Sequence, residues 1–259
     1  MNVFLRAALL GPLALLAGCA GLPEAGPEAQ LAHTPWAAQS VQLPDGGAAV
    51  SVAPQWLHHK LPGKKPTQFN YTRKDGRHAM AVLAASSASM LRSATRVEPA
   101  DLGKVRFSWK VPELIADADM ALRDADDSPV RVILAFEGDR SKFSPRDAML
   151  SELALTLTGE PMPYATLMYV WSNKRAPGTV ISSPRTDRIR KLVMESGAMK
   201  LDQWLDYERD IRADFERAFG EAPGALVGVG IMTDSDNTRS TARAWYGPVR
   251  LAPFAANRD

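Results

Sequence analysis

Hydrophobic and polar residues alternate most cleanly in the segment KVRFSWKV at residues 104–111. A period of two sends successive side chains to opposite sides of an extended chain. The pattern therefore predicts a half-buried strand. Its inward set is Val105, Phe107, Trp109 and Val111, and its outward set is Lys104, Arg106, Ser108 and Lys110.

A second pattern fills Gly224 to Leu251, GALVGVGIMTDSDNTRSTARAWYGPVRL. Its first part is apolar at both parities with glycines interspersed, which is typical of a strand buried on both faces and closely approached from one side. A polar turn at residues 234–238 follows. From Thr241 the period is two again, with Arg243 and Trp245 on one face. A hairpin is the simplest interpretation.

Strand-like segments recur along the rest of the chain, and Asp75-Gly76 between two of them is a strong hairpin-turn signal. They are residues 68–73, 79–84, 89–97, 130–137, 164–171, 188–196 and 204–210. Helical patterns cover only Ser141 to Thr158 and Ile211 to Phe219. Roughly ten short strands with one or two short helices predict an all-β, mainly antiparallel, jelly-roll-type β-sandwich.

The N-terminus has the features of an export signal. Arg6 precedes an apolar run that ends in Leu-Ala-Gly-Cys at Cys19, the single cysteine. These four residues resemble the bacterial lipoprotein signal box, which implies cleavage before Cys19 and its lipidation. Ala20, rather than Asp, then implies the outer membrane, facing the periplasm. The alternative is an ordinary cleaved signal with an incidental cysteine.

The chain thus divides into three predicted regions: a signal peptide at residues 1–18, a tether at 19–46 rich in Pro, Ala and Gly, and a sandwich domain at 47–253. Lys and Arg number 31 against 29 Asp and Glu. This balance removes the electrostatic basis for nucleic-acid binding, so the predicted partners are a membrane, through Cys19, and an envelope ligand.

Several motifs in order resemble the bacterial domain of unknown function 3047 family between about residue 47 and Leu251. They are WKV at 109–111, DDSPVRVILAF at 126–136, YVW at 169–171, VMESG at 193–197, DFERAFGE at 214–221, GVGIMTDSDNT at 228–238 and AWYG at 244–247. The family carries no assigned reaction. The resemblance implies a β-sandwich similar to galactose-binding-like domains and other carbohydrate-binding modules.

Two acidic loops are candidates for chemistry. Their carboxylate and amide groups are Asp124, Asp126, Asp127, Asp234, Asp236 and Asn237. If the loops meet, oxygens of Asp126, Asp127, Asp234 and Asp236 suit Ca²⁺, the only cofactor suggested. The same groups suit a glycosidase acid–base pair. The plainer alternative is that they cap turns and keep strand ends soluble.

Aromatic residues on the strands are expected mainly in the core. Trp245 is the exception, because it shares a strand face with Arg243 and the pair suits a polar ring ligand. A basic run at Arg185, Arg188, Arg190 and Lys191 is interpreted as a solvated strand edge.

We therefore expect a lipid-anchored envelope protein whose non-catalytic sandwich binds a saccharide or another envelope ligand. Two alternatives stay open: a glycan hydrolase using the paired Asp loops, and an accessory protein that binds another envelope protein. A hydrolase should show carboxylates converging in a deep cleft. A binding module should show exposed aromatic rings beside a shallow groove.

Overall fold

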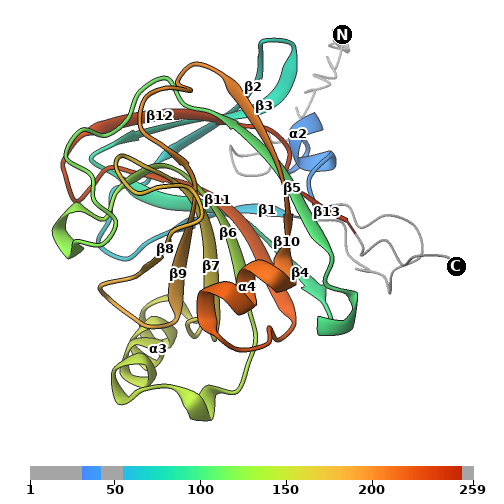
Figure 1. Cartoon of the computed structure of the whole chain (residues 1–259), viewed down its shortest axis with the longest axis vertical. Helices are drawn as coiled ribbons and strands as arrows, with labels where there is room; N and C mark the ends of the chain where they lie inside the picture. The colour runs from blue at the N-terminus through green and yellow to red at the C-terminus, as the bar shows by residue number, and fades with distance from the viewer. Residues whose placement is uncertain (1–30, 42–54, 253–259) are drawn as a thin grey trace, which may run out of the picture.

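The computed structural model describes residues 31–41 and 55–252, which form two β-sheets packed face to face (Figure 1). The larger sheet has seven strands: β1 (Trp56–Lys60), β4 (Ala88–Val97), β11 (Leu226–Asp234), β6 (Ser128–Phe136), β7 (Ala165–Ser172), β9 (Ile189–Ser196) and β8 (Val180–Ser182), in that spatial order. The smaller sheet contains β10 (Trp204–Asp210), β5 (Lys104–Lys110), β12 (Thr241–Tyr246), β3 (Arg77–Ala85) and β2 (Gln68–Lys74), and β13 (Arg250–Ala252) pairs with β5.

All strand pairs are antiparallel except β7 with β9, which is parallel. The predicted mainly antiparallel, jelly-roll-type sandwich is therefore confirmed. The α-helices α2 (Pro35–Ala38), α3 (Pro145–Thr158) and α4 (Ile211–Phe219) accompany it. Among those residues, no helix has the length and apolar character needed to cross a membrane.

The core lies between the two sheets, where apolar side chains lose contact with water. Val105, Phe107 and Trp109 point inward from β5 as the alternation predicted, and all three are buried. The Phe107 ring stacks on Tyr169 of the opposite sheet with 5.2 Å between ring centroids. This contact ties the two layers together at their centre.

Several local predictions are confirmed. Asp75-Gly76 forms the turn between β2 and β3, with φ of 51° and 79° at the two residues, the left-handed conformation that such a tight turn requires. Helix α4 has the predicted bounds, with Asp210 as its N-cap and Gly220 ending it at φ 71°. Helix α3 lies within the predicted Ser141 to Thr158, with Ser144 as its N-cap before Pro145 and Gly159 ending it.

The hairpin predicted for Gly224 to Leu251 is wrong. Strand β11 belongs to the seven-stranded sheet, between β4 and β6, whereas β12 belongs to the other sheet, between β5 and β3. The polar turn at residues 235–240 therefore crosses from one layer to the other. Alternating patterns reveal strands but carry no information about which sheet accepts them.

The tether also differs from expectation, because part of it folds onto the sandwich. Trp36 of α2 is fully buried, and its ring lies 4.7 Å from that of Trp56. Thr34 caps this short helix. Cys19 lies outside the described residues.

Candidate functional site

The two acidic loops meet at one end of the sandwich. The Asp127 carboxylate accepts hydrogen bonds from the backbone N–H and hydroxyl of Thr238, both at 2.7 Å, and from the Asn237 side-chain amide at 2.9 Å. The backbone N–H of Asn237 adds a fourth bond at 3.2 Å. Asp127 is thus saturated by donors from the loop after β11, and it fixes the turn that crosses between the sheets.

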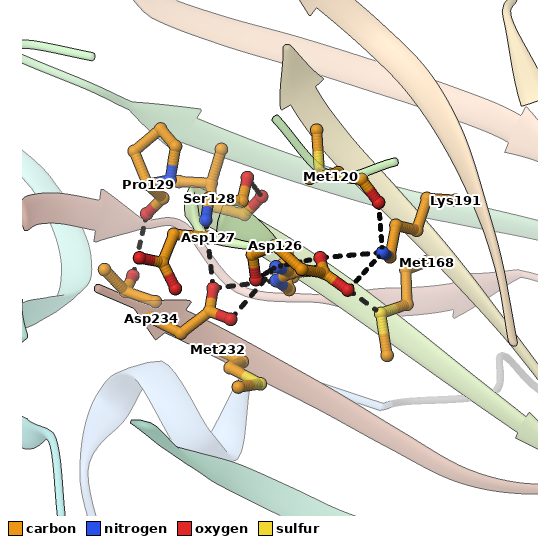
Figure 2. A network of polar contacts seen from close by, with 12 residues as sticks. Met120, Asp126, Asp127, Ser128, Pro129, Met168, Lys191, Met232 and Asp234 are labelled. Atoms are coloured by element: carbon orange, nitrogen blue, oxygen red, sulfur yellow. Dashed lines mark hydrogen bonds and ion pairs between the residues drawn. The ribbon is translucent and has the colours of Figure 1, made fainter. Parts of the chain in front are cut away.

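Beneath these loops lies a buried ionic network on the outward side of the seven-stranded sheet (Figure 2). Arg131 donates from Nε and Nη2 to the two oxygens of Asp234, at 2.8 and 2.9 Å. Its Nη2 also reaches Asp126 Oδ1 at 3.0 Å. Lys191 Nζ lies 2.7 and 2.6 Å from the two Asp126 oxygens and 2.9 Å from the Met120 carbonyl. Two cations face two carboxylates, so the formal charges balance.

Burial dominates the protonation of this network. It lowers the pKa of Lys191 to about 8, and the positive charge of Arg131 acts in the same direction. Burial also raises the pKa of Asp234 to about 6, against the pull of Arg131. For Arg131, burial acts to lower the pKa, but the fields of Asp234 and Asp126 outweigh it and raise the pKa. The guanidinium therefore stays charged.

The network is a structural device rather than an exposed acid–base pair. The side chains of Asp126 and Asp234 are 10% and 5% exposed, and both are paired with cations. Asp124 lies apart from them, exposed on a 3₁₀ turn at Arg123–Ala125. A general acid or base must reach the reacting atom of a substrate. In this arrangement the carboxylates converge on Arg131 and Lys191 instead of on a cleft.

Oxygens of Asp127, Asp234 and Asp236 lie within 4.8 Å of one another. Asp234 is engaged by Arg131, Asp236 forms an ion pair with Lys64, and Asp126 turns toward Lys191. A cation bound here would compete with these side-chain cations for the same oxygens. A calcium site at Asp126, Asp127, Asp234 and Asp236 stays a prediction.

The basic run at residues 185–191 is not a solvated edge throughout. Lys191 is 1% exposed and belongs to the network, and Arg188 lies over the Tyr164 ring at 4.9 Å. Arg185 donates to the Asn237 side chain at 3.0 Å. The prediction was wrong because the run looks continuous in sequence, whereas strand β9 turns alternate residues to different surroundings.

Trp245 and Arg243 lie on the outward face of the six-stranded sheet, because Tyr246 and Ala244 of the same strand point into the core. Trp245 pairs with Lys110 of β5, and Lys110 pairs on its other side with Trp204 of β10. Two partly exposed indoles therefore flank Lys110 in one row across the sheet. Lys74 Nζ lies 4.6 Å from the Trp245 ring centroid.

A shallow depression of about 580 Å³, the polar groove, adjoins this row. Its charged lining consists of Arg77, Arg106, Arg250, Asp206 and Glu208. Arg77 joins the groove to the row, since its guanidinium lies 5.2 Å from the Trp204 ring centroid and pairs with Asp206 at 2.7 Å. Arg106 pairs with Glu208 at 2.5 Å. Sequence reasoning placed Arg106 outward but assigned the groove residues no role.

The chain belongs to the family described as "Protein of unknown function (DUF3047)", whose model matches residues 54–250. No curated protein matches the sequence.

Several solved structures are similar to this chain at low identity, among them three glycan-related proteins. The xyloglucanase domain of NopAA, a type three effector from Sinorhizobium fredii solved with cellobiose, shares 10% identity over 76% of this chain and 92% of that one, at a TM-score of 0.38. The mannan-recognising carbohydrate-binding module TmCBM27 shares 12% over 76% and 86%, at 0.26. A loop-swap mutant of Necallimastix patriciarum Xyn11A shares 10% over 74% and 92%, at 0.29.

Proposed function

We propose that this protein is a lipid-anchored, non-catalytic envelope protein that binds a saccharide on the outward face of its six-stranded sheet. The observation that carries the proposal is the row of Trp204, Lys110 and Trp245 beside the polar groove. Partly exposed aromatic rings beside a shallow groove are the arrangement expected of a binding module, whereas a hydrolase is expected to have carboxylates in a deep cleft.

The chemistry of this face suits a sugar. Indole rings have flat apolar faces on which the C–H faces of a pyranose can stack once Lys74 and Arg77, which lie over the Trp245 and Trp204 rings, move aside. Arginine donors and carboxylate acceptors in the polar groove, such as Arg77 and Asp206, can exchange their exposed ion pairs for sugar hydroxyls. Because these pairs are open to water, that exchange costs little.

The proposed location follows from the lipoprotein-like signal. Lipidation at Cys19 would hold the protein at the outer membrane, facing the periplasm, with the sandwich free to meet envelope glycans. Changing Cys19→Ala should release the protein from the membrane fraction on cell fractionation. A variant that stays membrane-bound would disprove the anchor.

The binding proposal is tested by single substitutions in the row. Trp204→Ala and Trp245→Ala should each weaken binding of a soluble glycan by tenfold or more in calorimetry, with unchanged circular dichroism. Arg96→Ala, an exposed residue of the other sheet, is the matched control and should bind as the parent protein does. The proposal fails if envelope glycans do not bind, or if both tryptophan variants bind them normally. Unfolding of both variants would instead assign the rings to the core.

A further inference from the structure

The seven-stranded sheet carries a second, larger depression on its outward face, opposite the proposed saccharide site. It encloses about 810 Å³ and is called the apolar groove. Met90, Ile133, Met168 and Ile189 line it from the sheet, and Leu150, Leu153 and Leu157 line it from α3. Figure 1 shows α3 standing off beyond the lower ends of β7 and β9.

Helix α3 does not bury its apolar residues. Its buried side chains are the polar pair Asp147 and Ser151. Leu153 and Leu157, which line the groove, are 51% and 58% exposed, and Met149 and Leu155, outside its lining, are 63% and 42% exposed. A helix normally packs its apolar stripe on the adjacent sheet. Here a space of ligand size separates the two apolar surfaces, and exposed apolar surface of this kind marks a binding site.

The floor of the apolar groove is low because β11 contributes glycines there. Gly228 lies between Ala135 of β6 and Ala94 of β4, and Gly230 lies between Ile133 of β6 and Arg92 of β4. A Cβ added at Gly230 would have its nearest neighbour at 3.3 Å, the Leu91 carbonyl oxygen, and a longer side chain would extend from there into the groove. At Gly230 the floor thus forms a narrow trough between the larger side chains of Ile133 and Arg92.

The rim offers a positive charge to the occupant. Arg140 donates to the Ser151 hydroxyl at 3.0 Å and to the Met162 carbonyl at 2.7 Å. Its guanidinium has no carboxylate within ion-pair distance anywhere in the described part of the chain. By contrast, Arg92 on the same rim is already paired with Glu160. An anionic group at Arg140 would therefore pair with a guanidinium that no carboxylate of the described residues already engages.

We propose that the apolar groove binds one aliphatic acyl chain of an anionic amphiphile, with the chain along the trough and the headgroup at Arg140. A trough walled by leucine, isoleucine and methionine, without exposed indole rings, accommodates a flexible methylene chain better than a sugar ring. This site is independent of the proposed saccharide site, because it lies on the other sheet.

The test uses the full chain carrying Cys19→Ala, so that no attached lipid competes. Titration with dodecanoate, tetradecanoate and hexadecanoate should show one site whose affinity rises with each added methylene, because more apolar surface is buried. Leu153→Arg, at an exposed helix position, should lower the affinity at least tenfold with the fold intact. Gly230→Leu should act in the same way by filling the floor.

Two comparisons separate this proposal from others. Arg140→Gln should weaken hexadecanoate binding while leaving hexadecanol binding unchanged, and Trp245→Ala should bind hexadecanoate like the parent protein. The proposal is overturned if affinity does not depend on chain length, or if Leu153→Arg binds normally. It is also overturned if the protein sediments with phosphatidylglycerol vesicles without binding monomeric hexadecanoate, or if Leu153→Arg only dissociates a dimer.

Discussion

The outward faces of the two sheets differ in how far their ion pairs are exposed to water. On the six-stranded sheet the Arg77–Asp206 ion pair has side chains 44% and 63% exposed, next to partly exposed tryptophans. On the seven-stranded sheet the Arg131–Asp234 pair has side chains 4% and 5% exposed, and the apolar groove lies on the same face. The same pairing chemistry thus occurs in water in the first pair and out of water in the second.

This difference separates positions that hold the fold from positions that can exchange partners. Water screens an exposed pair, so its members can leave each other for a ligand at little cost. A buried pair has lost its hydration, and neither member can lose the other without leaving a bare charge in a medium of low dielectric constant. The first face is suited to binding, and the buried network is suited to holding the loops in place.

The largest effect should come from breaking the buried network. Arg131→Met leaves Asp126 and Asp234 without their shared guanidinium, and removing one partner of a buried pair typically costs about 3–5 kcal/mol. We expect the free energy of unfolding to fall by this amount in urea denaturation, or the variant to fail to accumulate. The matched variant Arg77→Met, on the exposed pair, should cost at most about 1 kcal/mol. Equal losses in the two variants would refute the contrast between the faces.

A smaller effect should appear with pH. Lysine has an ordinary pKa of 10.5, and burial lowers that of Lys191 to about 8. Between these values the unfolded chain holds a proton that the folded protein has released. The free energy of unfolding therefore rises with pH from about 8 upward, by at most about 1.4 kcal/mol per pH unit, and this contribution is lost below 8.

Urea denaturation at pH 7.5 and 9.5 measures this slope, below the range in which buried tyrosines ionise. Lys191→Met should lack the slope, whatever its overall stability. An identical slope in the parent protein and in Lys191→Met would show that another group titrates.

Much of the fold could be predicted from the sequence because strands reveal themselves locally. Residues 104–111 alternate, and β5 has the predicted inward face. The choice of sheet could not be predicted in the same way. Strand β11 is apolar at both parities, since one side faces the core and the other lines the apolar groove. The pattern indicated burial on both sides and gave no sign that one side was open.

The candidate site could be predicted only in part from the sequence, for the same reason. The acidic loops were identified, but their partners Arg131 and Lys191 come from β6 and β9, which only the sheet order brings near them. Trp245 was singled out through its strand face, whereas its neighbour Trp204 follows from the register across Lys110. Contacts between strands that are distant in sequence can be predicted only when the order of the strands in the sheets is known.

The smallest effect is expected in the apolar groove itself. Leu157 is 58% exposed, so Leu157→Ser exposes little new surface and should change the free energy of unfolding by no more than about 0.5 kcal/mol. Leu134 is fully buried in the core, and Leu134→Ala should cost about 2–5 kcal/mol. Thermal and urea denaturation compare the two. A loss of 2 kcal/mol or more from Leu157→Ser would mean that α3 closes onto the sheet in solution and that the groove is part of the core. A negligible loss, together with weaker stabilisation by hexadecanoate in the variant, would show that these leucines serve a ligand rather than the fold.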